Sequence, residues 1–158
     1  MKLVAIDMDG TLLRRDGSVE EADRRALAWL GERGVAVALV TGRLWSGACE
    51  VAAELGLGGP MGCVDGSHIV ALDGADLQRR AIPADDARRI RALLGARGAS
   101  LFRLAADGIT YEPDGDRFAA YVSIWSPRIR RVDDHGVDPA WTDPDGILGM
   151  VAVGREAM

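Results

Sequence analysis

The first thirteen residues constrain the fold more than any other stretch of the chain. Residues 3–6 (Leu-Val-Ala-Ile) form an apolar run that predicts a buried β-strand. The carboxylates Asp7 and Asp9 follow at once, with Gly10 and Thr11 behind them. Open α/β sheets bind their ligands beyond the carboxyl ends of parallel strands. The pattern therefore predicts an α/β fold with a ligand site at the end of its first strand.

The spacing of the two acids indicates what that ligand site holds. If the strand continues through Asp9, the side chains of Asp7 and Asp9 point to the same face. Neighbouring carboxylates repel each other unless a cation or N–H donors stabilise their charge, and Mg²⁺ prefers such hard oxygen ligands. We therefore expect Asp7 and Asp9 to be metal ligands. The alternative is a strand that ends in a solvated Asp-Gly turn, but the complete pattern favours function.

A second apolar run predicts a neighbouring parallel strand. Ser18 and Glu21 have the spacing of a capping box, so we expect a helix to begin at Ser18 and to end at Gly34. Residues 35–40 are nearly all apolar, which is typical of a strand buried on both faces. The right-handed crossover of such a β-α-β unit places the carboxyl ends of both strands at the same edge of the sheet.

The residues that follow this second strand are suited to binding phosphate. Thr41, Gly42 and Arg43 supply a hydroxyl, an accessible backbone N–H and a guanidinium, which are groups that bind phosphate oxygens. The tripeptide alone also fits an ordinary strand-to-helix turn. Its position beside Asp7 and Asp9 favours the phosphate-binding interpretation.

The remaining elements are predicted from periodicity and turn residues. In the first half we expect a helix over 45–55, a strand over 61–64, a turn at Asp65-Gly66-Ser67, and a hairpin over 69–72 and 77–82. In the second half we expect a helix over 84–96, strands over 100–104, 109–112 and 119–125, a loop over 126–145, a strand over 147–153 and the start of a helix over 154–158.

The segment from Asp7 to Leu13 resembles the first motif of the haloacid dehalogenase-like (HAD) phosphatase superfamily, and its flanks are most similar to the Cof-type branch. The resemblance implies a HAD-like Rossmannoid parallel sheet, incomplete in this chain. Residues 1–82 would be the N-terminal part of the core, and residues 83–158 part of an α+β cap. It implies that Asp7 is the nucleophile that becomes an aspartyl-phosphate, and that Asp9 is the general acid and base.

The same resemblance extends to the other candidate site residues. It implies that Thr41 and Gly42 hold the transferring phosphoryl group and that Arg43 lies near the substrate phosphate. The Cof-type branch usually has Asn-Gly-Ala where this chain has residues 65–67. We therefore take Asp65 and Gly66 as candidate substrate-side residues, although Asp65 adds negative charge near a phosphate.

The resemblance implies two further groups late in the chain: a lysine that neutralises the nucleophile and the phosphate, and an acidic motif that completes the Mg²⁺ site. Neither has a counterpart in this sequence. Lys2 is the only lysine, and it lies at the opposite end of the predicted strand from Asp7. The acid pairs Asp133/Asp134 and Asp143/Asp145 follow loops, so we expect them to be solvated rather than part of an acidic metal-binding motif.

Two functions follow from these motifs. The first is a Mg²⁺-dependent phosphatase that hydrolyses a small phosphorylated metabolite resembling a sugar phosphate. The alternative is a truncated or non-catalytic binding or assembly module, with a second chain or a homo-oligomer completing the core. A receiver domain is disfavoured because it has no place for Thr41-Gly42-Arg43.

Composition excludes other classes of protein. The formal net charge of −5 argues against a nucleic-acid-binding protein. No apolar run approaches the length of a membrane span. Cys49 and Cys63 have neither metal-site nor disulfide-framework spacing, and Met1 leads directly into a strand. We therefore expect a cytoplasmic protein.

Overall fold

The computed structural model describes residues 2–106, 108–138, 143 and 146–154. By its internal contacts the chain divides into two compact units, Met1–Gln78 (unit 1) and Arg79–Met158 (unit 2). The predicted boundary after residue 82 lies four residues beyond this division. The interpretation of the two units as core and cap stays a prediction.

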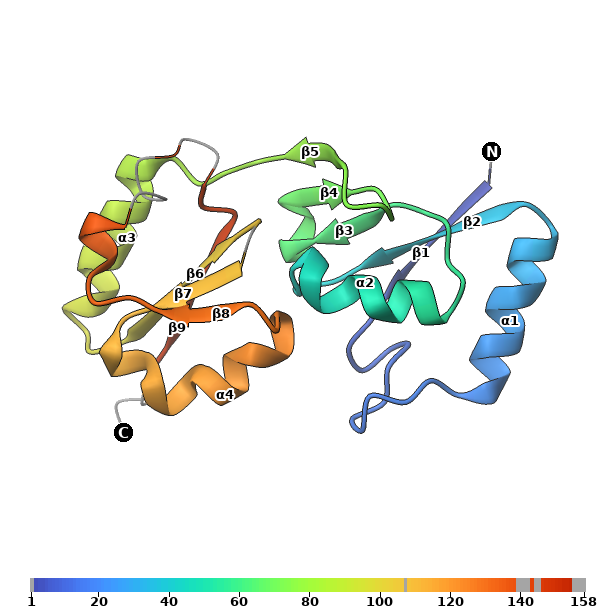
Figure 1. Cartoon of the computed structure of the whole chain (residues 1–158), viewed down its shortest axis with the longest axis horizontal. Helices are drawn as coiled ribbons and strands as arrows, with labels where there is room; N and C mark the ends of the chain where they lie inside the picture. Colours follow the sequence, from blue (N-terminus) through green and yellow to red (C-terminus); the bar gives the residue numbers. More distant parts are fainter. Residues whose placement is uncertain (1, 107, 139–142, 144–145, 155–158) are drawn as a thin grey trace. The chain divides into compact units, whose positions relative to one another are not determined.

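Unit 1 contains a sheet whose first three strands are parallel (Figure 1). Its elements are β1 (Lys2–Asp7), α1 (Glu21–Glu32), β2 (Val35–Val40), α2 (Trp45–Glu54), β3 (Met61–Cys63), η1 (Val64–Gly66), β4 (His68–Val70) and β5 (Asp76–Arg79). The sheet order is β1-β2-β3-β4-β5, and β4 runs antiparallel to β3. The last residue of β1, Asp7, is paired with the last residue of β2, Val40, so the two strands end at the same edge.

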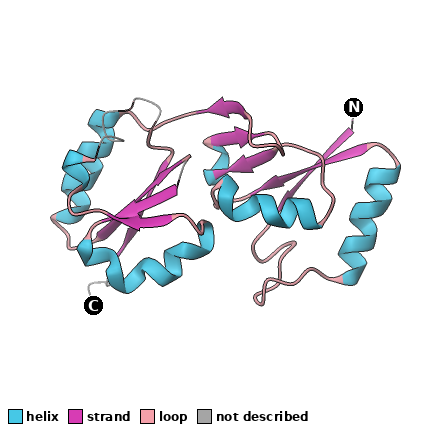
Figure 2. Cartoon of the chain, viewed as in Figure 1, coloured by secondary structure: helices cyan, strands magenta, loops and turns pink. Residues whose placement is uncertain are grey.

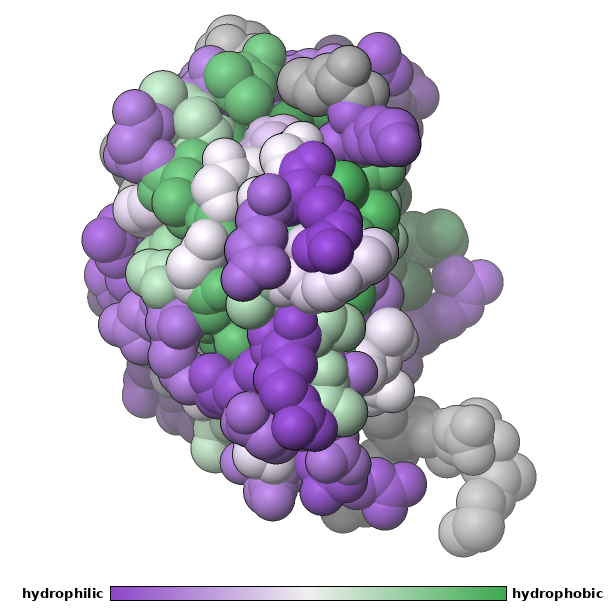
Figure 3. All heavy atoms as spheres, turned by 90° about the vertical axis from the view of Figure 1, so that its right-hand side faces the viewer, coloured by the Kyte–Doolittle hydropathy of each residue, from purple (hydrophilic) through white to green (hydrophobic). Residues whose placement is uncertain are grey.

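The prediction that the first strand is buried is wrong, although the strand itself is present. Leu3 is 51% exposed, and Ala5 and Asp7 are also exposed, whereas Val37 and Leu39 of β2 are buried. The reason is the sheet order: β1 is an edge strand of the described sheet, while β2 has neighbours on both sides. Figure 3 shows hydrophobic surface between the hydrophilic side chains of this end of unit 1.

The predicted capping box of the first helix is also wrong. Helix α1 begins at Glu21 after Glu20, which makes no side-chain capping bond. Ser18 instead bonds backward to Asp16, whose Oδ1 accepts from the Ser18 hydroxyl (2.6 Å) and from the Ser18 N–H (3.0 Å). These bonds lower the pKa of Asp16. They also fix Ser18 in the preceding turn, so it cannot cap the helix.

Unit 2 contains an antiparallel pair extended on both sides into a four-stranded sheet (Figure 2). Its elements are α3 (Ala84–Gly95), β6 (Ser100–Ala105), β7 (Gly108–Tyr111), η2 (Pro113–Phe118), α4 (Ala119–Val122), η3 (Ser123–Trp125), β8 (Ile129–Arg131), η4 (His135–Val137) and β9 (Gly149–Val153). The sheet order is β8-β7-β6-β9, with β8 parallel to β7 and β9 antiparallel to β6.

The strand predicted over 119–125 is wrong, because this segment is helical in α4 and η3. The apolar residues of this segment differ in burial: Val122 is buried, while Tyr121 and Ile124 are 59% and 50% exposed. A helix presents one side to the interior in this way. The loop predicted over 126–145 likewise contains β8 and η4, and the helix predicted from residue 154 lies outside the described residues except for Gly154.

The interior of unit 2 holds charged side chains as well as apolar ones. All residues of β6 are buried, including Arg103, which is 1% exposed. The Arg103 Nε donates to the Thr110 hydroxyl (2.9 Å), and its Nη2 lies 3.8 Å from Asp138 Oδ2. His135 is fully buried beside the same hydroxyl, with its Nε2 3.2 Å away.

Among the described residues, no helix combines the length and the hydropathy that a membrane span requires.

Candidate active site

A tight turn after β1 positions the first acids of the candidate site. Asp7 is the last residue of β1, and its Oδ2 accepts a hydrogen bond from the Thr11 hydroxyl (2.7 Å). Met8 is fully buried, and its carbonyl accepts from the N–H of Leu13 (2.7 Å). Gly10 has φ +82°, a left-handed conformation that favours glycine. The strand therefore does not continue through Asp9, and it is the turn that keeps Asp9 beside Asp7.

Arg43 joins the turn after β2 to the turn after β1. Its Nε donates to Asp9 Oδ2 (2.9 Å) and its Nη2 to Asp9 Oδ1 (2.5 Å). Its Nη1 donates to the carbonyl oxygen of Gly47 in α2 (3.2 Å). Such a two-pronged guanidinium–carboxylate contact fixes both position and orientation. The structure thus brings Arg43 into contact with Asp9, the second of the two predicted acids, which lies 34 positions earlier in the sequence.

Thr41 and Gly42 lie at the same edge of the sheet, as the parallel arrangement predicts. Thr41 is buried, and its N–H donates to the carbonyl of Gly62 in β3 (2.8 Å). Its hydroxyl oxygen accepts from the N–H of Arg43 (3.1 Å). These bonds fix the conformation of the turn that holds Thr41, Gly42 and Arg43 directly after β2.

The segment after β3 packs against this turn. The N–H of Val64 donates to the carbonyl of Arg43 (3.0 Å), and the N–H of Asp65 donates to the carbonyl of Thr41 (3.2 Å). The Asp65 Oδ1 lies 3.3 Å from the place where a side chain on Gly42 would begin. Asp65, one of the two candidate substrate-side residues, is therefore in contact with the candidate phosphate-binding turn.

The oxygen donors of Asp7 and Asp9 fit a magnesium ion. Asp7 and Asp9 are exposed and lie on one turn, and Mg²⁺ in proteins is commonly held by one or two carboxylates together with waters and substrate phosphate. Among the residues that the structure describes, no cluster of three or more Asp, Glu, His or Cys side chains forms a closed metal cage. Asp7 and Asp9 could therefore hold such an ion only together with water or substrate oxygens.

The late acids are part of the structure of unit 2, as far as they are described. Asp134 Oδ1 accepts from the N–H of Gly136 (2.6 Å) and from Arg91 Nη2 (2.8 Å), and these bonds lower its pKa, with Gly136 the larger cause. Asp143 accepts a turn bond from Gly146 through its carbonyl oxygen (3.0 Å). Asp145 lies outside the described residues.

Other groups that sequence reasoning set aside are accounted for by packing. Cys63 is fully buried in β3, and burial, with a smaller contribution from Cys49, raises the pKa of its thiol to about 11. His68 is also buried, with its Nε2 2.6 Å from Asp76 Oδ1. Lys2 is exposed. It is the first residue of β1 and Asp7 is the last, so the backbone of Lys2 lies at the far end of the strand from Asp7.

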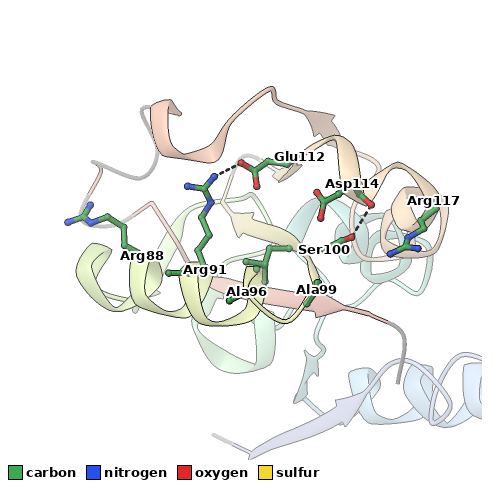
Figure 4. A pocket seen from close by; sticks show the side chains of 12 residues that line it. Arg88, Arg91, Ala96, Ala99, Ser100, Glu112, Asp114 and Arg117 are labelled. Carbon is green, nitrogen blue, oxygen red and sulfur yellow. Dashed lines mark hydrogen bonds and ion pairs between the residues drawn. The ribbon is translucent and has the colours of Figure 1, made fainter. Parts of the chain in front are cut away.

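A cavity of about 610 Å³ lies in unit 2, between α3 and the segment that follows β7 (Figure 4). Arg91 points from α3 to Glu112, with Nη2 2.5 Å from Oε1, and Arg88 pairs with Asp85 of its own helix. Arg117 stacks over the Phe118 ring at 4.6 Å. Most charges of this cavity thus already have partners within the protein, and none of the sequence-predicted site residues lines it.

Two features of the candidate site had no signal in the sequence. The Gly47 carbonyl contributes through its backbone alone, and the left-handed conformation of Val64 (φ +49°) is not one that a β-branched residue suggests. The pairing of Asp9 with Arg43 was also not predicted. Its signal in the sequence is a cationic residue at the end of the neighbouring strand, within reach of the second acid.

Comparison with known proteins identifies the family. The family model of haloacid dehalogenase-like hydrolases matches residues 4–135. An HMP-PP phosphatase of Serratia proteamaculans is 37% identical over 89 residues, which are 56% of this chain and 32% of the relative. A 5-amino-6-(5-phospho-D-ribitylamino)uracil phosphatase of Bacillus subtilis is 38% identical over 69 residues, 44% of this chain and 28% of the relative.

Solved structures show the same fold. A putative HAD/COF-like hydrolase from Plasmodium vivax superposes with a TM-score of 0.78 at 19% identity, covering 98% of this chain and 57% of that protein. The chain therefore spans little more than half the length of this structural neighbour, and its aligned segment about a third of the curated relatives. The chain belongs to the haloacid dehalogenase-like hydrolase family.

Proposed function

We propose that this chain carries the nucleophile and the phosphate-binding turn of a Mg²⁺-dependent phosphatase that acts on a small phosphorylated metabolite, such as a sugar phosphate. The observation that carries the proposal is the contact of Arg43 with Asp9, which joins the acidic turn after β1 to the Thr41-Gly42-Arg43 turn after β2. The phosphatases among the curated relatives support it.

The nucleophile in this proposal is Asp7. Its Oδ2 is held by the Thr11 hydroxyl, so we assign Oδ1 as the oxygen that attacks phosphorus in line with the leaving alcohol. The P–O bond to the alcohol breaks as the bond to Asp7 forms, and Asp9 hands a proton to the departing oxygen. In the second step Asp9 takes a proton from water, which attacks phosphorus and regenerates Asp7.

The phosphate-binding groups act in this scheme by positioning. Thr41 and Gly42 donate hydrogen bonds from the hydroxyl and the backbone N–H to phosphoryl oxygens. Arg43 exchanges its two-pronged contact with Asp9 for one with the phosphate, which offers the guanidinium the same paired oxygens. This exchange would free Asp9 for proton transfer at the moment the substrate is bound. Asp7 and the backbone carbonyl of Asp9 would hold the Mg²⁺, which would offset the negative charge of the phosphoryl group.

The test replaces the nucleophile. Asp7→Asn keeps the size of the side chain but removes the anionic oxygen, so we expect Mg²⁺-dependent hydrolysis of p-nitrophenyl phosphate to fall to background. Glu32→Gln is the matched control. Glu32 ends α1, and the length of β2, about 20 Å, separates it from the site. Mg²⁺-dependent turnover that survives in Asp7→Asn would falsify the assignment.

A second candidate function is a non-catalytic binding or assembly module that completes its core with a second chain or another copy. The exposed Leu3 on the edge strand β1 favours it, because a further strand or layer would bury that face. The two functions differ in one measurement. The module binds phosphate or a partner chain with Mg²⁺ present but does not hydrolyse p-nitrophenyl phosphate.

A further inference from the structure

The turn that carries Asp65 has a backbone conformation that few side chains adopt. Val64 and Asp65 both lie in the left-handed region, at φ +49° and φ +52°. A β-branched residue such as Val64 is a genuine exception there. Two backbone bonds to the Thr41-Gly42-Arg43 turn impose the conformation, from Val64 N–H to Arg43 and from Asp65 N–H to Thr41. Conformations of this kind concentrate where a site must be held in one geometry.

The result of this geometry is that the Asp65 carboxylate lies against Gly42. Its Oδ1 is 3.3 Å and its Oδ2 3.9 Å from the position of a Cβ on Gly42, and Asp65 is exposed to solvent. Gly42 is the residue whose N–H we assign to the phosphate. A phosphate bound at Gly42 therefore lies near the Asp65 carboxylate.

Asp65 differs from Asp9 in its charge environment. Asp9 is paired with Arg43, whereas in the part of the chain that the structure describes no Lys, Arg or His forms an ion pair with Asp65. A carboxylate without a cationic partner repels a second anionic group of a ligand and attracts a cation or a hydrogen-bond donor. It therefore discriminates between phosphate esters by what they carry next to the phosphate.

We propose that Asp65 is a specificity-determining residue, which selects phosphomonoesters with an ammonium or hydroxyl group close to the phosphate and rejects those with a second acidic group there. The inference rests on the proposed phosphate site and adds the class of substrate. It follows from the contact of Asp65 with Gly42 and from the absence of an ion pair to Asp65 among the described residues.

The test compares two phosphate esters of similar size whose second groups, an ammonium and a carboxylate, have opposite charge. 2-Aminoethyl phosphate and 2-phosphoglycolate are titrated into the full chain with Mg²⁺, and binding is followed by the amide NMR signal of Gly42. We expect the wild-type chain to bind the amino ester roughly tenfold more tightly, and Asp65→Asn to reduce this preference to about twofold. Asn keeps the shape of the side chain and tolerates the left-handed conformation.

Control variants separate charge from folding. Glu32→Gln removes one negative charge from the far end of unit 1 and should leave the preference unchanged. Asp65→Gly, which accepts φ +52° without strain, should lose the preference as Asp65→Asn does, and so serves if the Asn variant does not fold.

The outcomes distinguish the two proposals. Equal binding of both esters by the wild-type chain, or a preference that Asp65→Asn and Asp65→Gly retain, overturns the role of Asp65 and leaves the phosphate site standing. Failure of both esters and of inorganic phosphate to shift the Gly42 signal overturns the phosphate site, and the role of Asp65 with it.

Discussion

Arg43 is the residue on which most of the candidate site depends. It contacts Asp9 after β1 and the Gly47 carbonyl in α2, and its backbone N–H and carbonyl bond to Thr41 and Val64. Only 19% of its side chain is exposed, so its position is set by these contacts rather than by solvent. One side chain thus relates the acids, the phosphate-binding turn and the turn of Asp65.

Replacing Arg43 by lysine should weaken phosphate binding about tenfold. Lysine keeps the positive charge but cannot make the two-pronged contact with Asp9 or with a phosphate. The measurement is a titration with inorganic phosphate in the presence of Mg²⁺. Arg33→Lys, at the far end of unit 1, is the control. Unchanged affinity in Arg43→Lys would mean that Arg43 does not contact the phosphate.

His135 should make stability depend on pH. Its burial lowers the pKa of the imidazole below 6.5, an effect that Glu112 opposes in part, while Arg103 and Arg91 add to it. The Thr110 hydroxyl lies 3.2 Å from its Nε2, and Glu112 Oε2 lies 3.8 Å from its Nδ1. As the pH falls below about 6.5, the unfolded chain binds a proton that the folded chain does not. We expect the free energy of unfolding to decrease there, by at most about 1.4 kcal/mol per pH unit from this group.

The measurement is urea unfolding of the wild-type chain and of His135→Gln at pH 7.5, 6.5 and 5.5. The variant should be less stable at pH 7.5 because it changes a fully buried residue, but its stability should fall less between pH 6.5 and 5.5. Parallel decreases in the two proteins would show that another group causes the pH dependence.

At the scale of elements, the connections that follow the strands decide the site more than the strands do. β1 and β2 end in register, which brings their loops together, but the turn at Met8–Leu13 and the turn at Val64–Gly66 set where Asp9 and Asp65 lie. The connection between α2 and β3 is equally close-packed. A Cβ on Gly59 would lie 2.1 Å from the carbonyl oxygen of Val37 in β2.

Gly59→Ala should therefore destabilise unit 1, whereas its neighbour should tolerate the same change. Alanine at residue 59 forces the connection away from β2, for which we expect a cost of about 1–3 kcal/mol. Around Gly58 nothing lies within 4 Å of an added Cβ, so Gly58→Ala should change stability by less than about 0.5 kcal/mol. Chemical unfolding of both variants checks the prediction, and equal effects would contradict it.

At the scale of the whole molecule, each unit has its own sheet and its own interior. Unit 1 is centred on β2 with Val37 and Leu39, and unit 2 on β6 with Phe102, which stacks on Tyr111 at 5.3 Å between ring centroids. The contacts that divide the chain indicate two bodies that can lose structure separately.

Phe102→Ala should expose this division. Removal of a fully buried ring costs about 3–5 kcal/mol, and we expect the loss to be confined to unit 2. Native-state hydrogen exchange, followed amide by amide, should show reduced protection in β6, β7 and β9 and unchanged protection in β2 and β3. A uniform decrease across both units would instead indicate one cooperative molecule.

Local residue patterns were enough to predict several parts of this protein. The apolar runs predicted β1, β2 and β9, and the carboxyl ends of parallel strands placed Asp7, Asp9 and Thr41–Arg43 at one edge, because parallel strands end together. The family was also identifiable from the residues around Asp7. The roles of these residues stay predictions.

Features that depend on contacts between residues distant in sequence are visible only in the folded chain. The pairing of Arg43 with Asp9, the contact of Asp65 with Gly42 and the exposure of Leu3 on an edge strand all follow from which segments become neighbours. The helical form of residues 119–125 has the same origin, because short apolar segments adopt the structure in which packing buries one side. Local residue patterns do not contain that information, since it arises when the chain folds.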